Sequence, residues 1–246
     1  MIHYIKFEFK NMLGYSIAMI VGGLLPLVLA IGGYHSSKNI ADNYHLAITL
    51  FATLLPMIPL GLVILPFTIS FGRDTASGIT TRFNLFGYTL IKQMIAKFAS
   101  VVILVIGVTI IYLMVLLNVL SFPNPSMMTI VNIFFGILLL TMSLYLIAFS
   151  IAQIFKEFSM IQGVAMVVYF GIAILTGTMG GFHLTGFPKM IGQFIPFEAL
   201  RDNLISNWTT PCFSLSKEFI QLLIFLMFTI VLFIIVNLFR IHSRRR

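Results

Sequence analysis

Long runs of apolar residues alternate with short polar segments along the whole chain. Six runs have about 20 residues or more, enough for an α-helix to cross a hydrocarbon core about 30 Å thick. They cover residues 14–34, 47–71, 98–120, 130–152, 159–180 and 218–239. Asp, Glu, Lys and Arg are absent from the first five, and only Glu218 lies at the edge of the last. The pattern predicts an all-α integral membrane protein, a single domain over residues 1–246 with six transmembrane helices.

Individual runs carry further signals. The second contains Pro56, Pro59 and Pro66, and we expect a bend there because proline removes a backbone donor and crowds the preceding turn. The first run is longer than the core of a signal peptide and ends without a small-x-small cleavage site, so we expect a retained helix. The fourth and fifth runs are separated only by a short segment near 153–158, which predicts an antiparallel hairpin.

The segment before the first run, residues 1–13, has two interpretations. Its alternation of apolar and charged residues around 5–10 is typical of a strand. Helical spacing instead collects apolar residues on one face and two lysines on another. The apolar set is Ile2, Ile5, Phe9 and Met12, and the lysines are Lys6 and Lys10. A lone strand would leave its edges unpaired, so we predict a helix lying flat at the membrane interface.

The distribution of Lys and Arg predicts the orientation, because basic residues concentrate in cytoplasmic segments. With both termini inside, eleven of the fifteen basic residues are cytoplasmic. The inner set is Lys6, Lys10, Arg73, Arg82, Lys92, Lys97, Lys156, Arg240, Arg244, Arg245 and Arg246, and the outer set is Lys38, Lys189, Arg201 and Lys217. The polar segment 72–84, GRDTASGITTRFN, then lies in the longest cytoplasmic loop. We expect the basic tail to contact membrane lipids.

Composition agrees with a bilayer environment. The chain is 59% hydrophobic and 9% charged, with a mean hydropathy of +1.06, whereas a soluble domain is roughly one quarter charged. Its net charge of +8 would point to nucleic acid in a soluble protein. Here the basic residues flank apolar runs, so we expect no nucleic-acid partner. The single cysteine, Cys212, excludes a disulfide within the chain and a cysteine metal cluster.

Recognisable catalytic motifs are missing. The sequence has no G-x-x-x-x-G-K-[ST], H-E-x-x-H or G-x-S-x-G. Its histidines, His3, His35, His45, His183 and His242, are scattered among loops on both sides, so no metal site and no catalytic residue is expected. Ser70 and Ser143 have no histidine within a run to activate them, which disfavours an intramembrane protease.

The absence of charge inside the runs also disfavours an ion-driven carrier, since these carriers commonly hold a titratable group at mid-membrane. Energy for transport would then come from another subunit. Such a subunit needs a cytoplasmic docking surface, and the polar loop 72–84 is the only sizeable candidate.

Three segments carry a family resemblance. The start reads MIHYIKFEFKNMLGY, the loop reads FGRDTASGITTR followed by LFGY and later Lys97, and residues 187–201 begin with Phe187-Pro188 and end in IPFEALR. Their order around six runs resembles the permease subunits of ABC-2-type ATP-binding-cassette exporters over nearly the whole chain. Asp74, Ser77-Gly78 and Arg82 match the family's acidic residue, small turn and basic residue. The chain departs from it in having one acid there and Ile79 in place of a threonine.

The resemblance implies that the loop forms a coupling helix in a groove of a separate ATP-binding subunit. The residues expected to make this contact are Arg73, Asp74, Ser77, Gly78, Arg82, Phe83 and Phe86. Asp74 and Thr75 would cap the start of the helix, Gly78 would allow close backbone approach, and Arg82 would bond a partner carboxylate. Phe83, Leu85 and Phe86 would bury apolar surface. The alternative is a solvated loop with a short amphipathic helix on the lipid surface.

The segment 181–216 resembles the family's external helices, which re-enter the outer leaflet and close the pathway. Pro196, Phe197, Glu198 and Arg201 would form this outer gate. Glu198 and Arg201 are three residues apart, so we expect them to pair on one helical face. Trp208 suits a membrane interface. The alternative is a loop that only covers the helix ends.

The resemblance therefore implies the membrane-spanning subunit of an ATP-driven exporter in a bacterial cell membrane. ATP and Mg would bind a partner subunit, and a second permease, identical or paralogous, would complete the pathway. Fourteen Met and 25 Phe favour an amphipathic peptide, antimicrobial or lipid-like substrate. As a small permease with short outer loops, the chain also resembles the subunits that export peptide toxins such as phenol-soluble modulins or give bacteriocin immunity. The alternative from another class is an ATP-independent secondary carrier, channel or membrane scaffold.

Overall fold

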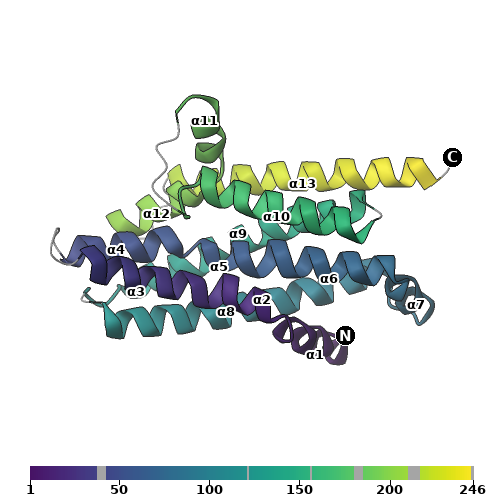
Figure 1. Ribbon diagram of the computed structural model, residues 1–246, viewed down its shortest axis with the longest axis horizontal. Helices are drawn as coiled ribbons and strands as arrows, with labels where there is room; N and C mark the ends of the chain where they lie inside the picture. Colours follow the sequence, from purple (N-terminus) through teal and green to yellow (C-terminus); the bar gives the residue numbers. More distant parts are fainter. Residues whose placement is uncertain (38–42, 121, 156, 180–184, 210–216, 245–246) are drawn as a thin grey trace.

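Helices make up every secondary-structure element in the described part of the chain. The computed structural model describes residues 1–246 except 38–42, 121, 156, 180–184, 210–216 and 245–246 (Figure 1). The elements are α1 (Ile2–Leu13), α2 (Ser16–Met19), the π-helix η1 (Ile20–Leu24), α3 (Leu25–Ser37), α4 (Asn43–Leu54), α5 (Met57–Pro59), the π-helix η2 (Leu60–Ile64), α6 (Leu65–Ala76), α7 (Ile79–Leu85), α8 (Leu90–Val119), α9 (Met127–Ile154), α10 (Phe158–Leu175), α11 (Phe187–Phe194), α12 (Phe197–Ser206) and α13 (Lys217–Arg244). Lys38, Lys156, His183, Cys212, Arg245 and Arg246 lie outside the described residues.

Five helices of the described chain are long and apolar enough to cross a membrane. They are His45–Ala76, Leu90–Val119, Met127–Ile154, Phe158–Leu175 and Phe219–Phe239. These correspond to five of the six predicted runs and confirm the membrane character of the fold. The first run contains a shorter apolar helix, Ile20–Ser36, so the count of six spans stays a prediction.

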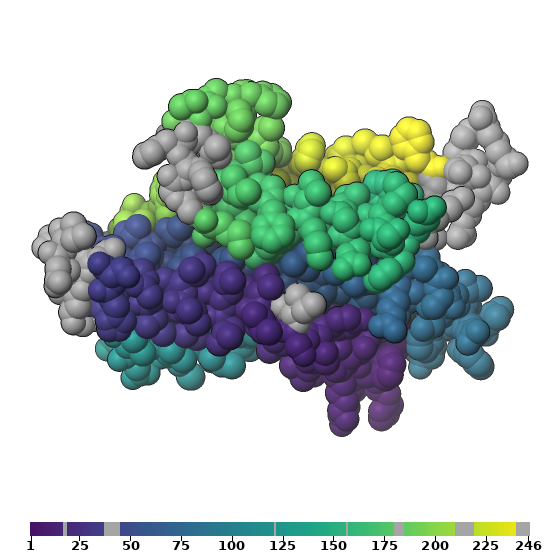
Figure 2. Space-filling model, viewed as in Figure 1, coloured from purple at the N-terminus to yellow at the C-terminus, as the bar shows by residue number. Residues whose placement is uncertain are grey.

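The long helices lie side by side along one axis, with α7 at one end of the bundle and α12 near the other (Figure 1). The helix His45–Ala76 is the central one, since 83% of its most apolar stretch is buried, against 22% for Phe219–Phe239. Its second half, α6, packs against α9 and α10. Helix α1 forms a ridge on the flank of the bundle (Figure 2). The central helix ends at Ala76, and α7 begins at Ile79, so the two are joined by only a short turn.

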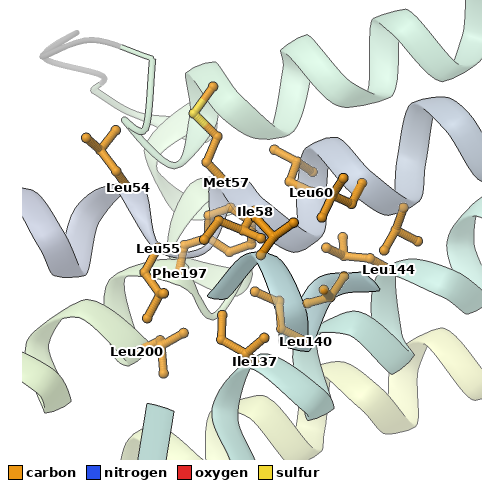
Figure 3. Packing of buried hydrophobic residues seen from close by; sticks show 14 of the residues in the cluster. Leu54, Leu55, Met57, Ile58, Leu60, Ile137, Leu140, Leu144, Phe197 and Leu200 are labelled. Atoms are coloured by element: carbon orange, nitrogen blue, oxygen red, sulfur yellow. The ribbon is translucent and has the colours of Figure 1, made fainter. Parts of the chain in front are cut away.

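The prolines of the central helix interrupt it, as predicted. Helix α4 ends at Leu54, just before Pro56, and η2 follows Pro59. Buried side chains fill the space around the break (Figure 3). Leu55, Met57 and Ile58 come from the central helix, Ile137, Leu140 and Leu144 from α9, and Phe197 and Leu200 from α12. The core therefore closes around the break without exposing it.

Both π-helices precede the same dipeptide. Residues 20–26 read IVGGLLP and residues 60–66 read LGLVILP, and η1 and η2 occupy the first five positions of each. Proline lacks an N–H and crowds the carbonyl four residues earlier, which here belongs to Gly22 or Leu62. A widened π turn accommodates this mismatch. The same local rule therefore produces both segments.

The two π-helices touch each other at glycines. A Cβ placed on Gly61 would lie 2.6 Å from the Cα of Gly22, and a Cβ on Gly22 would lie 2.7 Å from the backbone nitrogen of Leu62. Side chains larger than hydrogen therefore cannot enter this crossing unless the backbones move apart. The contact fixes α2, η1 and α3 against the central helix.

Trp208 lies inside the protein, and its place at the level of the membrane interface stays a prediction. Only 2% of the residue is exposed. Its indole Nε1–H donates to the Pro123 carbonyl at 2.9 Å, and its ring packs edge-on against Phe51 and Phe122. The indole nitrogen finds its acceptor inside the protein, in the segment between α8 and α9.

Gly61→Ala should destabilise the protein by roughly 1–3 kcal/mol, because the added methyl meets backbone atoms that cannot rotate away. Gly107→Ala is the matched control, since a Cβ at that helical position meets nothing within 4 Å and alanine favours the helix by about 1 kcal/mol. Thermal unfolding in detergent measures both. Equal midpoints for the two variants would contradict the tight crossing.

Candidate functional site: a buried charge triad beneath the α7 loop

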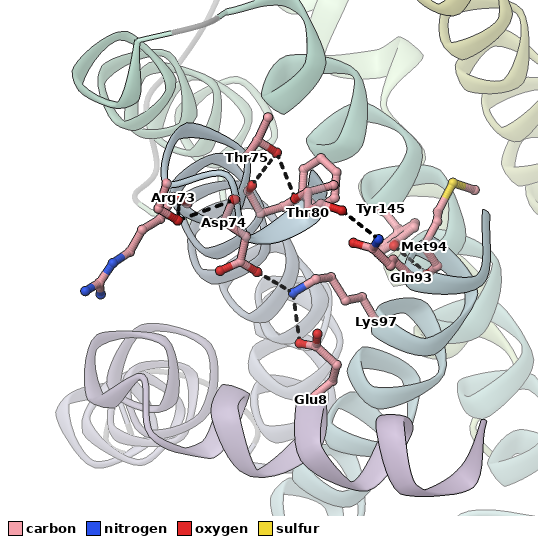
Figure 4. A network of polar contacts seen from close by, with 11 residues as sticks. Glu8, Arg73, Asp74, Thr75, Thr80, Gln93, Met94, Lys97 and Tyr145 are labelled. Atoms are coloured by element: carbon pink, nitrogen blue, oxygen red, sulfur yellow. Dashed lines mark hydrogen bonds and ion pairs between the residues drawn. The ribbon is translucent and has the colours of Figure 1, made fainter. Parts of the chain in front are cut away.

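A buried lysine joins three helices below α7. The Lys97 Nζ donates to Glu8 Oε2 at 2.8 Å and to Asp74 Oδ2 at 2.9 Å (Figure 4). The Lys97 and Glu8 side chains are each 2% exposed and that of Asp74 is 20% exposed. Glu8 belongs to α1, Asp74 to the last turn of α6 and Lys97 to α8. We call these three residues the charge triad.

The triad is electrostatically demanding. Each ion loses most of its hydration, and that loss is offset only if hydrogen bonds and opposite charge replace it. Charge-assisted bonds such as these two are about twice as strong as neutral ones. Because two carboxylates share one ammonium, Lys97 is the member without which both acids lose their partner. The triad therefore tolerates removal of Lys97 less well than removal of either acid.

Aromatic rings cover the triad. Tyr4 lies on the same face of α1 as Glu8, with ring centroids 5.4 Å from Phe83 and 5.0 Å from Tyr88. Burial raises the pKa of the Tyr4 hydroxyl above its usual range, and the nearby charge of Glu8 raises it further. Tyr4 is therefore a neutral phenol at physiological pH. The rings exclude water from the charges and so strengthen their attraction.

The face of α1 that packs on the bundle carries a charged residue, which sequence analysis did not predict. It consists of Tyr4, Glu8 and Met12, of which only Met12 was in the predicted apolar set, and Ile2 is exposed. The helix itself is confirmed. The prediction concerned an apolar face for a helix lying flat at the membrane interface and left the side toward the protein open; there α8 offers a cation that bonds a carboxylate.

Helix α8 carries a row of polar side chains toward its neighbours. Gln93, Lys97 and Ser100 are spaced four and three apart, which places them on one helical face. The Gln93 Nε2 donates to the Thr80 carbonyl at 3.1 Å and to the Tyr88 carbonyl at 2.7 Å. The Ser100 hydroxyl donates to the Ile5 carbonyl at 3.0 Å. One face of α8 thus holds both α1 and the ends of the α7 loop.

The predicted cap of the loop helix is wrong. Asp74 and Thr75 end α6 rather than begin α7, and the Thr75 hydroxyl donates back to the Phe71 carbonyl at 2.8 Å. The Ser77 hydroxyl similarly donates to the Arg73 carbonyl at 2.8 Å. The residue preceding α7 is Gly78, and its φ of 74° favours glycine at this position. The acid bonds Lys97 because α6 continues past the expected end of its span.

The remaining predicted contact residues divide into two groups. Phe83 is half-buried against Tyr4 and Tyr88, so it belongs to the interior of the loop. Arg73, Arg82 and Phe86 are exposed, and none of the ion pairs in the described chain includes either arginine. Leu85 and Phe86 are 83% and 80% exposed. The outward side of the loop is thus both cationic and apolar.

The predicted outer gate lies near the other end of the bundle, in short helices as expected. Pro196 precedes α12, and Phe197 is buried in the core. Arg201 Nε bonds Asp202 Oδ1 at 2.9 Å instead of pairing with Glu198. The adjacent carboxylate reaches the guanidinium first. These four residues make no contact with the charge triad.

Sequence analysis missed Glu8, Gln93 and Ser100 as site residues and noted Lys97 only through the family resemblance. The spacing of Gln93, Lys97 and Ser100 at the start of an apolar helix was the available signal. Among the described residues, no group of three His, Cys, Asp or Glu could hold a metal ion. No protein-family model matches the chain, and no curated protein is significantly similar to it.

Lys97→Met should destabilise the protein by about 3–5 kcal/mol, because it strands two carboxylates in a site with little water. The triple change Glu8→Leu, Asp74→Leu and Lys97→Met should recover much of that loss, since no buried charge remains. Lys92→Met is the control, because Lys92 is exposed. Thermal unfolding in detergent ranks the variants, and a triple variant less stable than Lys97→Met would contradict this account.

Gln93→Leu should loosen the loop, since the Thr80 and Tyr88 carbonyls both lose their side-chain donor. Hydrogen exchange of the segment 79–89 should accelerate by roughly five- to tenfold, equivalent to about 1–1.5 kcal/mol. Asn118→Leu is the control, because that exposed amide bonds only the Met114 carbonyl of its own helix. Unchanged exchange in Gln93→Leu would show that the loop is held by other contacts.

Proposed function

We propose that this chain is the membrane-spanning subunit of an ATP-driven exporter of the ABC-2 type, and that a separate ATP-binding subunit docks on α7. The observation that carries the proposal is the outward side of the α7 loop. Arg82, Leu85 and Phe86 are exposed there on a helix that extends from the central helix of the bundle. Exposed aromatic and arginine side chains are the residues that dominate protein interfaces.

The charge triad supports a coupling role for this loop. A force on α7 reaches α6 through the chain, and it reaches α1 and α8 through Lys97 and Gln93. Such a loop moves as part of the bundle rather than flexing alone. ATP hydrolysis in the partner subunit, with its Mg, would then reposition the central helix. This chain would supply no catalytic residue.

The proposal includes a sixth crossing formed by α2, η1 and α3, which run without interruption over residues 16–37. An even number of crossings places both termini on one side, and the basic residues near α7 favour the cytoplasm of a bacterial cell for that side. A second permease subunit, identical or paralogous, would complete the pathway. The exposed Met and Phe side chains along the helices favour an amphipathic or hydrophobic substrate, such as a peptide, antimicrobial or lipid-like molecule.

The outer segment has a supporting part in this proposal. Pro196 precedes α12 and Phe197 begins it, and this helix packs against α4 and α13. Movement of the central helix would therefore reach α12 directly, and Glu198 and Arg201 would lie at the outer mouth of the pathway.

Co-purification tests the docking site. The chain is expressed with the ATP-binding protein encoded beside its gene, extracted in mild detergent and captured through the membrane subunit. Arg82→Ala with Phe86→Ala should reduce recovery of the ATPase roughly tenfold or more, since two interface anchors are lost. Phe187→Ala with Met190→Ala is the matched control, because these side chains are equally exposed but lie on α11.

Three outcomes would count against the proposal. An ATPase that fails to bind the unaltered chain removes the energy source, and an ATP-independent carrier, channel or scaffold then replaces the exporter. Equal loss in the α11 control would show nonspecific adhesion. Full recovery with Arg82→Ala and Phe86→Ala would place docking elsewhere.

A further inference from the structure

Helix α1 presents three parallel rows of side chains, each spaced four residues apart. Tyr4, Glu8 and Met12 form the row that packs on the bundle. The next row around the helix contains Ile5 and Phe9, both half-buried, and the exposed Leu13. The row beyond it contains Lys6 and Lys10, both exposed. The order around the helix is therefore protein, apolar, basic.

The basic row has no partner within the described part of the chain. None of its ion pairs includes Lys6 or Lys10, and the one carboxylate on α1, Glu8, faces inward to Lys97. Exposed apolar side chains continue on the same helix, with Ile2 and Phe7 among them. Exposing this apolar surface to water would be unfavourable. The order of the rows therefore suits an environment that is apolar beside the apolar row and anionic beside the basic row.

The position of α1 meets that need. The helix lies on the flank of the bundle, toward the end that carries α7, and not over the bundle's end (Figures 1 and 2). Its neighbour α8 enters a membrane-spanning segment at Leu90. With α8 crossing the bilayer from Leu90, this flank would lie where lipid headgroups meet acyl chains. Long lysine side chains beside an apolar row can reach headgroup phosphates from there.

We propose that α1 is a docking surface for anionic phospholipid, in which Lys6 and Lys10 bind the headgroup phosphates and Ile5, Phe9 and Leu13 contact the acyl chains. A lipid on the outer side of α1 then presses Glu8, on its inner side, toward Lys97. The leaflet would thus stabilise the charge triad from outside. This proposal goes beyond the exporter function and does not depend on any ATP-binding subunit.

Purified full-length protein in a neutral detergent tests it. Phosphatidylglycerol is titrated in, and the thermal midpoint is compared with a phosphatidylcholine titration. Phosphatidylglycerol should raise the midpoint of the unaltered chain, and Lys6→Gln with Lys10→Gln should require about 25-fold more of it, at about fivefold per lysine. Lys6→Arg with Lys10→Arg should keep the response. Added salt should weaken it, since exposed charges are screened.

The control variant is Arg73→Gln with Arg82→Gln, which removes the same charge at the same end of the bundle and should respond as the unaltered chain does. An equal loss of response in this control would mean that net charge alone attracts the lipid, which overturns the assignment to α1. No preference for phosphatidylglycerol over phosphatidylcholine would also overturn it. So would a Lys6 and Lys10 variant that responds normally to lipid but loses the ATPase, because the basic row would then belong to a protein partner.

Discussion

The ammonium of Lys97 is the constraint around which the end of the bundle below α7 is arranged. Holding it away from water requires carboxylates from two other helices, and Glu8 and Asp74 supply them over separations of 89 and 23 residues along the chain. Neither α1 nor the end of α6 can shift without exposing or stranding a charge. Tyr4 and Gln93 also stabilise this arrangement. Tyr4 excludes water from the charges, and Gln93 hydrogen-bonds the backbone around α7. A loop that is short and mostly exposed thereby acquires the rigidity of the helices below it.

Rigidity at the α7 end contrasts with the middle of the same helix. The central helix is broken near Pro56 and widened over η2, and its contact with η1 involves glycines. The glycine crossing holds η1 against η2 by close backbone packing, whereas the triad joins three helices by charge. Motion applied at α7 would therefore be carried as a unit up to η2, where the backbone hydrogen bonding already departs from the α pattern.

The sequence predicted most of the architecture and little of the site, for physical reasons. An uninterrupted apolar run predicts a buried helix, whether lipid or protein covers it, and prolines predict a break. Five spans and the break at the prolines could therefore be predicted from the sequence. The partner of a charge is not readable from a local pattern. Asp74, four residues before Gly78, fits the start of one helix as well as the end of the preceding one, and its bond to Lys97 goes with the second arrangement. Likewise, the sequence predicted an apolar face on α1. It could not predict the burial of Glu8, because the partner of Glu8 lies on α8. The burial of Trp208 was not predicted for the same reason, because its acceptor at Pro123 is remote along the chain.

The placement of Trp208 has an optical consequence. It is the only tryptophan of the chain, and its indole is enclosed by Phe51 and Phe122 with its N–H bonded to a carbonyl. Its near-ultraviolet emission therefore originates from a single, dry environment beside α12, far along the bundle from α7. A shift in the emission wavelength would signal that water has entered that end. Events confined to the charge triad would leave the emission spectrum unchanged. The emission of the unlabelled protein thus reports whether the end beside α12 has opened to water, independently of events at α7.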